Sequence, residues 1–196
     1  MNLDPDARLL AGLRAGDEAA FVELVRRYSP ALLRLAQAYV PSRAVAEEVV
    51  QDTWLGVVRG IDRFEGRSTV KTWLFRIAAN RARTRGAREP RTLPLGDWDE
   101  GPSVDPDRFL PADHPKWPHH WAVEPSQIVE TAETIAHVRD AIDRLPPMQR
   151  AVITLRDVQG WDGAEVCDAL ELSEGNQRVL LHRARSSVRA QLEAIA

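Results

Sequence analysis

Apolar residues recur every three or four positions through residues 5–88, as they do on the buried side of amphipathic helices. Asp17 and Ser42 each precede such a run and are expected to be helix N-caps. Ser29 followed by Pro30 has the pattern of another N-cap with proline at the first helical position, which predicts that a separate helix starts there. No stretch alternates with period two for long enough to predict a strand, so the predicted fold class is all-α.

The helical periodicity disappears between about residues 89 and 125, where prolines are frequent and acidic residues outnumber basic ones. This composition predicts an extended acidic, proline-rich linker between a helical domain over 1–88 and a second one over 126–196. The linker also holds aromatic residues that are unusual for a solvated tether and suggest docking on the flanking domains or on a partner: Trp98, Phe109, Trp117 and Trp121.

Residues 160–189 have the pattern of a helix-turn-helix whose second helix is rich in arginine. Asp162 and Glu165 are spaced as a capping box at the start of the first helix. On the second helix, a rotation of about 100° per residue aligns a buried stripe of Leu181, Ala184, Val188, Leu192 and Ile195. The opposite side is predicted to read base edges and carries Asn176, Arg178, Val179, His182, Arg183 and Ser186. The alternative is a solvated basic face without a ligand.

The net charge of −3 gives no overall signature of a nucleic-acid-binding protein, so DNA affinity has to come from local charge. Such a local cluster begins at Lys71 and continues through six arginines to Arg91, with Glu89 as its one acidic residue. Cys167 is the single cysteine, which excludes an internal disulfide and fits a reducing compartment. Because no apolar run approaches the roughly 20 residues that span a bilayer, a soluble cytoplasmic protein without membrane insertion is expected.

Two blocks together resemble an extracytoplasmic-function (ECF) sigma factor of the sigma-70 family. Residues 44–54 (AVAEEVVQDTW) and 64–80 (FEGRSTVKTWLFRIAAN) are similar to sigma region 2, and residues 145–185 are similar to sigma region 4. The two blocks occur in the family order, with no region 3 domain between them. The resemblance implies an alternative sigma factor that binds bacterial core RNA polymerase and directs it to promoters, where it promotes DNA opening.

The resemblance also implies partners and sites. Region 2 is expected to bind the β′ coiled coil through a polar, acidic helix face of Glu47, Glu48, Gln51 and Asp52. It is expected to open the −10 element and hold its single strand with Phe64, Gly66, Arg67, Ser68, Thr69, Lys71, Arg76, Asn80, Arg81 and Arg83. Region 4 is expected to read the −35 duplex near the β flap, and an anti-sigma factor is a further expected partner. Trp54 and Trp73 are interpreted as core residues, because each shares a helical face with apolar neighbours.

Several positions depart from the family pattern, among them Asn176, Gln177 and Leu180 on the second helix of the helix-turn-helix, which leave the −35 sequence uncertain. Arg67 replaces a common acidic residue and Val70 a common aromatic one, so the −10 specificity is expected to differ. Glu171 stands in the helix-turn-helix corner where glycine is usual. It must either accept a left-handed backbone or change the turn.

No nucleophile–base pair or phosphate-cradling loop is evident, so neither an enzyme nor a cofactor is expected. A metal site at His114, His119 and His120 is an alternative, but two prolines interrupt the cluster, so no metal is expected there. Cys167, the nearest possible cysteine ligand, is distant in sequence and is expected to be a core residue. The acidic residues 95–115 are hypothesised to occupy a polymerase channel built for nucleic acid. Two alternatives remain: a two-domain regulator that binds palindromic duplex without polymerase, and a sigma-like protein that sequesters polymerase.

Overall fold

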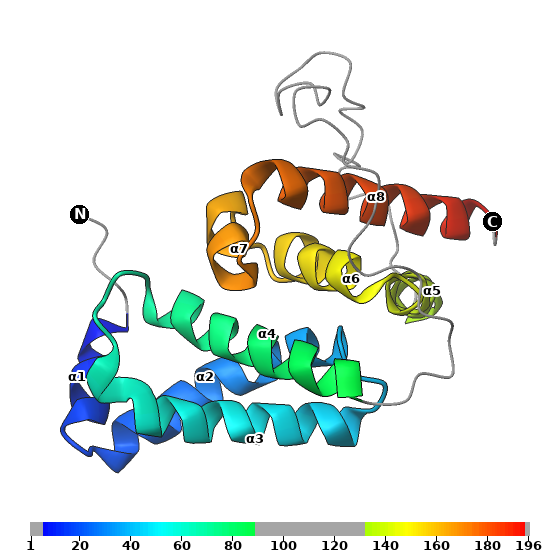
Figure 1. Cartoon of the computed structure of the whole chain (residues 1–196). Helices are drawn as coiled ribbons and strands as arrows, with labels where there is room; N and C mark the ends of the chain where they lie inside the picture. The colour runs from blue at the N-terminus through cyan, green and yellow to red at the C-terminus, as the bar shows by residue number, and fades with distance from the viewer. Residues whose placement is uncertain (1–5, 89–131, 195–196) are drawn as a thin grey trace.

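The computed structural model describes residues 6–88 and 132–194, in which every regular element is helical (Figure 1). The predicted all-α fold is therefore confirmed. The N-terminal half contains α1 (Ala7–Arg14), α2 (Glu18–Gln37), α3 (Arg43–Gly60), the 3-10 turn η1 (Ile61–Arg63) and α4 (Val70–Arg88). The C-terminal half contains α5 (Ala132–Asp143), α6 (Pro147–Ile153), the π-helical turn η3 (Thr154–Val158), α7 (Gly163–Leu170) and α8 (Glu174–Glu193).

The predicted linker falls between these two halves and outside the described residues, together with its aromatic residues, its histidines and the channel hypothesis for residues 95–115. The domain limits at 88 and 126 therefore stay predictions. Within the described ranges, no group of three or more His, Cys, Asp or Glu side chains is arranged to hold a metal ion. Nor does either range contain a helix long and apolar enough to cross a membrane.

Local capping fixes the helix starts as predicted. The Asp17 carboxylate accepts hydrogen bonds from the backbone N–H groups of Ala19 and Ala20 at the start of α2. The Ser42 hydroxyl accepts from the N–H of Val45 at the start of α3. Both residues satisfy amide donors that the first helical turn leaves without a partner.

The separate helix predicted at Pro30 is wrong, because α2 runs through this residue without a break. Proline inside a helix removes one backbone hydrogen bond and costs about 3 kcal/mol. On either side of it, however, α2 buries Leu24, Leu32 and Leu35 completely, at roughly 1.5–3 kcal/mol each. Burial of a continuous apolar side thus outweighs the local cost. The Ser29 hydroxyl does not act as a cap; it accepts a hydrogen bond from the Trp54 indole Nε1 at 2.9 Å.

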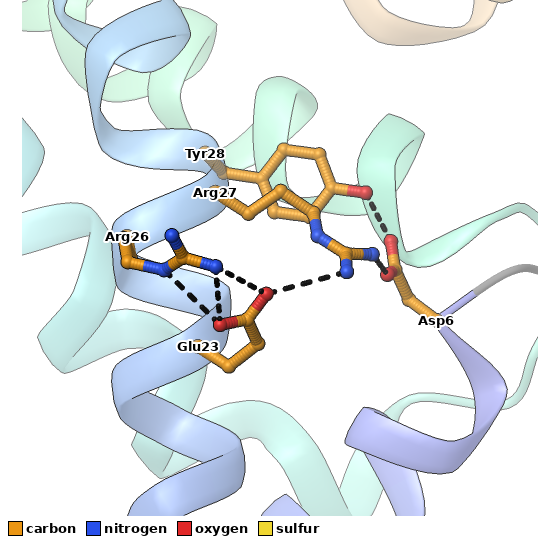
Figure 2. A network of polar contacts seen from close by, with 5 residues as sticks. All are labelled: Asp6, Glu23, Arg26, Arg27 and Tyr28. Atoms are coloured by element: carbon orange, nitrogen blue, oxygen red, sulfur yellow. Dashed lines mark hydrogen bonds and ion pairs between the residues drawn. The ribbon is translucent and has the colours of Figure 1, made fainter.

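A polar network fastens the start of α1 to α2 (Figure 2). The fully buried Asp6 carboxylate accepts hydrogen bonds from the Arg27 guanidinium and the Tyr28 hydroxyl. Burial, followed by the hydrogen bond to Asp6, raises the pKa of Tyr28 above its ordinary value. Tyr28 therefore stays a neutral donor at physiological pH. Beside it, Glu23 links Arg26 and Arg27 on the exposed side of α2.

The helix-turn-helix forms with the predicted capping box. The Asp162 carboxylate accepts from the Glu165 N–H, and the Glu165 carboxylate accepts in turn from the Asp162 N–H. Glu171 ends α7 in the left-handed region, with φ 58° and ψ 46°, so the corner keeps its geometry without glycine. Ser173 then caps α8. On α8, the predicted stripe is buried at Leu181, Ala184 and Val188 and partly buried at Leu192, while Ile195 lies outside the described residues.

The two halves pack against each other, a contact that the sequence did not predict. α4 packs against α7 (Figure 1). α2 contacts η3. At the centre, the rings of Phe75 on α4 and Trp161 before α7 lie 4.4 Å apart. Further links join the backbone of α2 to the second half: Gln159 donates to the Ala31 carbonyl and Arg150 to the Gln37 carbonyl. The described residues thus share one hydrophobic core.

Candidate polymerase and nucleic-acid interfaces

The acidic face predicted on α3 is exposed along its whole length and consists of Glu47, Glu48, Gln51 and Asp52. Two apolar side chains, Leu55 and Val58, continue this side of the helix at three- and four-residue spacing and are 53% and 51% exposed. Neither residue was predicted from the sequence, although their helical spacing from Gln51 places them on this side of α3. Exposed apolar residues beside acidic ones are suited to a basic, partly apolar protein partner.

An open hollow of roughly 500 Å³ lies between α3 and α4. Its α3 wall includes Glu48 and Asp52, and its α4 wall includes Asn80, Arg81 and Arg85. Glu48 and Arg85, one from each wall, form an ion pair of 2.8 Å. The residues predicted to bind polymerase and those predicted to bind −10 DNA therefore meet at one continuous surface.

The loop before α4 is set by its backbone and by the cap of that helix. Gly66 has φ 72°, a conformation that disfavours any side chain. The Thr69 hydroxyl accepts a hydrogen bond from the N–H of Thr72 at 3.1 Å, and so fixes the loop to the first turn of α4. Arg67 is exposed at the tip and pairs with Glu65 at 3.0 Å, while Ser68 is partly exposed.

Phe64 does not belong to the open part of this loop, which corrects the predicted role in base capture. It is 7% exposed, and its ring packs on Trp73 with 4.7 Å between the ring centroids. An apolar ring beside a large aromatic neighbour gains more from burial than from solvent exposure. Phe64 therefore stabilises the loop by packing on Trp73 and does not project from its open side. Trp54 is buried as interpreted, and Trp73 is partly buried.

The polar residues predicted along α4 lie on its surface, and three of them contact α7. Lys71 Nζ lies 2.8 Å from Glu165 Oε1 and 3.8 Å from the centroid of the Trp161 ring. Arg76 Nε donates to the Asp168 carbonyl at 3.0 Å. Further along, Arg83 is 3.7 Å from the Glu171 carboxylate and also donates to Asn80. Arg81 lies against Gly56 of α3.

The predicted reading side of α8 is exposed at Asn176, Arg178, His182 and Ser186 and partly exposed at Arg183. Arg178 forms an exposed ion pair with Glu174 at 3.0 Å. Val179 is an exception, since it is 9% exposed and does not present its methyl groups to solvent. Val179 is therefore not part of the exposed side of α8.

Two further groups near α8 are structural. Arg185 makes a bidentate ion pair with Asp157 of η3, at 2.9 and 2.7 Å. These hydrogen bonds raise the pKa of Arg185 and fix α8 to the preceding turn. Cys167 is partly buried, less than the predicted core position, and burial raises the pKa of its thiol.

Comparisons with known proteins match both halves. The Sigma-70 region 2 model matches residues 24–92, and the Sigma-70 region 4 model matches residues 136–188. The ECF RNA polymerase sigma-E factor of Salmonella typhimurium is 31% identical over 93% of this chain and 92% of its own length. The ECF RNA polymerase sigma factor SigG of Mycobacterium tuberculosis is 37% identical over 89% of this chain and 48% of its own length.

Two solved structures have the same fold. CnrH in complex with the cytosolic domain of CnrY matches with a TM-score of 0.65 and 23% identity, over 97% of this chain and 99% of that one. The sigma factor RpoE of Bartonella quintana, in complex with the anti-sigma factor NepR, matches with a TM-score of 0.57 and 21% identity, over 88% and 96%. The chain belongs to the ECF RNA polymerase sigma factors of the sigma-70 family and is an alternative sigma factor of transcription initiation.

Proposed function

We propose that this sigma factor divides its work among three surfaces. The exposed side of α3 binds the β′ coiled coil of core polymerase, and the loop before α4 together with α4 holds the opened −10 strand. The N-terminal half of α8 reads the −35 duplex. The factor catalyses no covalent step and needs no cofactor, because it acts by positioning polymerase on DNA. We also propose that it works in the bacterial cytoplasm.

The proposal that α3 binds core polymerase rests on the exposed side of this helix, which is both acidic and apolar. Glu47, Glu48 and Asp52 repel the DNA backbone, so a nucleic-acid partner is disfavoured there. Leu55 and Val58 gain from burial against a protein surface. The hollow between α3 and α4 joins this surface to Asn80 and Arg81, so the proposed polymerase and −10 surfaces are neighbours.

The −10 surface is supported by cations placed around an open loop. Arg67 and Lys71 flank the turn at Gly66, and Arg76, Arg81 and Arg83 follow along α4. Cations along a groove neutralise the backbone of a single strand, which makes binding strongly salt-dependent. With Phe64 buried, an unpaired base would be bound by the backbone and hydroxyl groups of Ser68 and Thr69 rather than stacked on this ring.

The proposed −35 readers are Asn176, Arg178, His182, Arg183 and Ser186. Arginine binds the O6 and N7 atoms of guanine bidentately, and asparagine binds adenine in the same manner. The solved relatives CnrH and RpoE are bound to CnrY and to the anti-sigma factor NepR. By analogy, we propose that an anti-sigma factor also binds this chain.

The proposed function is tested by run-off transcription with bacterial core polymerase on a genomic fragment library, with and without this factor. Core-dependent starts with shared upstream −35 and −10 motifs are expected. A factor that binds core but gives no starts would instead be a sequestering protein. Binding of palindromic duplex DNA without core polymerase would instead support the alternative of a two-domain regulator.

Two arginine variants separate base reading from backbone contact. Arg183→Ala is expected to cost roughly 1–3 kcal/mol of holoenzyme affinity at the preferred −35 sequence and to relax the preference at one base pair. Arg81→Ala is expected to weaken all promoters by similar factors, because a phosphate contact carries no sequence information. Holoenzyme binding to a set of single-base −35 variants measures both effects. An unchanged −35 preference in Arg183→Ala would exclude this reading face.

A further inference from the structure

Arg14, the last residue of α1, ties that helix to the segment that leads into the proposed −10 loop. Its Nε donates a hydrogen bond to the Ile61 carbonyl at 3.4 Å, and its Nη2 donates to the Phe64 carbonyl. Ile61 begins the turn η1, and Phe64 directly follows it. The guanidinium is planar and holds its N–H donors in a fixed arrangement, so one side chain binds both carbonyls at a set separation. Arg14 therefore fixes the backbone that enters the loop.

The loop has an anchor on each side and an exposed part between them. Phe64 is the first anchor, since its ring is buried and its carbonyl accepts from Arg14. Thr69 is the second anchor, because its hydroxyl accepts a hydrogen bond from the Thr72 N–H. Residues 65–68 between them are exposed or partly exposed. Few backbone dihedrals separate this exposed part from either anchor, so a shift of one anchor moves it as well.

α1 is itself held in place by two contacts with α2. Before its first turn, the buried Asp6 carboxylate accepts hydrogen bonds from Arg27 and Tyr28 (Figure 2). In its middle, a β-carbon added at Gly12 would lie 2.7 Å from the Ala20 β-carbon, so the two helices approach closely there. A helix of eight residues is not stable alone in water, and these contacts fix its position. The last turn of α1 is therefore a rigid support.

We propose that Arg14 is a positioning residue for base recognition in the −10 element. The inference rests on the proposed function, because the loop that Arg14 supports is the one proposed to bind an unpaired −10 base. Arg14 does not contact the base; its hydrogen bonds hold the polar groups of Ser68 and Thr69 in one arrangement. Hydrogen bonds discriminate between bases only while donors and acceptors keep a fixed geometry. Loss of Arg14 therefore lowers selectivity more than overall affinity.

Attraction of the DNA backbone is the alternative role for Arg14, which is an exposed cation. Charge and shape separate the two roles. Lysine keeps the charge but carries a single ammonium group, which does not reproduce the paired donors of a guanidinium. Arg8 provides a matched control, because it is also exposed on α1 and its replacement by alanine changes the net charge equally.

Hydrogen exchange of the full chain, followed by NMR, tests the positioning role without DNA. The reporter is the Phe64 amide, which donates to the Ile61 carbonyl at 3.1 Å across η1. We expect Arg14→Ala to exchange this proton about three- to tenfold faster, because hydrogen bonds from a charged group stabilise the turn. Arg14→Lys should show at least half of this change on a logarithmic scale, and Arg8→Ala should show none. Unchanged exchange in Arg14→Ala would overturn the proposal.

Base selectivity is measured in holoenzyme with fork-junction DNA that carries the −10 element found by run-off transcription, with each base replaced in turn. We expect Arg14→Ala and Arg14→Lys to lower discrimination at one or two adjacent −10 bases by about three- to tenfold, with the −35 preference unchanged. Arg8→Ala should discriminate as wild type does. Full restoration by Arg14→Lys would show that charge alone acts. Equal weakening for all bases, or a lower melting temperature with unchanged selectivity, would also overturn the proposal.

Failure of this inference and failure of the proposed function give different results. If run-off transcription gives starts with shared motifs but the Arg14 variants keep wild-type selectivity, the inference fails and the proposed function stands. If no starts appear although the Phe64 amide exchanges faster in Arg14→Ala, Arg14 holds the loop, but the −10 assignment fails and the role in base recognition fails with it.

Discussion

Glu171 has a left-handed backbone, with φ 58°, and it alone among the described non-glycine residues has a positive φ. A β-carbon in this region costs roughly 1–2 kcal/mol, because it approaches the following carbonyl oxygen. The sequence left two outcomes for this corner, a strained residue or a changed turn, and the structure has the strained residue. The strain is local, because the capping of α7 and α8 around it is regular.

Glu171→Gly is therefore expected to stabilise the protein by about 0.5–1 kcal/mol, since relief of the strain exceeds the extra chain entropy of glycine. Urea unfolding followed by circular dichroism measures the difference. Glu171→Gln serves as the control: it keeps the β-carbon and removes the charge, so its stability should stay within about 0.5 kcal/mol of wild type. A stabilisation in both variants would assign the effect to charge rather than to the backbone.

Single residues of the candidate site were harder to predict than its location. Arg67, Lys71 and Arg83 are on the surface, where the charge pattern put them. Phe64 is buried because its ring packs on Trp73, and Val179 is buried although exposed residues adjoin it on α8. A short apolar residue within a polar segment does not reveal in sequence what covers it.

Two glycines, Gly56 on α3 and Gly86 on α4, lie where neighbouring elements approach closely, and the atoms around them differ. A β-carbon added at Gly86 of α4 would lie 2.3 Å from the Tyr39 carbonyl oxygen, which is backbone and has little freedom to move. A β-carbon added at Gly56 of α3 would lie 2.6 Å from the Arg81 guanidinium, the flexible end of a long side chain. The close approach of α4 to the end of α2 thus depends on Gly86.

Gly86→Ala is expected to destabilise the protein by roughly 1–3 kcal/mol through this overlap, despite the higher helix propensity of alanine. Gly56→Ala is its matched control within a neighbouring helix. There Arg81 is able to move aside, so the propensity gain of about 1 kcal/mol should leave stability unchanged or higher. Thermal unfolding of both variants measures the contrast, and equal melting temperatures would show that α4 tolerates a shift.

Helix starts were predictable where capping is local. Asp17, Ser42 and Asp162 each satisfy amides within three residues, so the signal and its structural effect lie in the same short segment. Pro30 shows the opposite case. Its local pattern marks a helix start, but the burial of leucines on both sides of it depends on α3 and α4 and decides the outcome.

At the scale of the whole molecule, the packing of the two halves had no signal in sequence. Lys71 and Glu165 are 94 residues apart, and each has an ordinary role in its own helix: a surface cation on α4 and a capping residue on α7. Charges of opposite sign on two helices do not specify which pairs will meet. The order of regions 2 and 4 was predictable, and their contact was not.

The ion pairs that join α4 to Glu165 and Glu171 make a final prediction about salt. Added salt weakens the attraction of DNA to the −10 cations, but it also weakens the attraction of Glu165 and Glu171 to the same cations. In the free factor these two effects partly cancel, because DNA and α7 compete for the same cations.

The slope of log affinity against log salt for single-stranded DNA should therefore be shallower in wild type than in Glu165→Gln/Glu171→Gln. The expected difference is roughly 0.5–1, on a scale where each neutralised phosphate contributes about 0.7. Anisotropy titrations between about 50 and 300 mM salt measure the two slopes. The control Glu18→Gln/Glu193→Gln, which removes the same charge at exposed positions of α2 and α8, is expected to follow wild type. Parallel lines for all three proteins would show that α7 leaves the −10 cations accessible in solution.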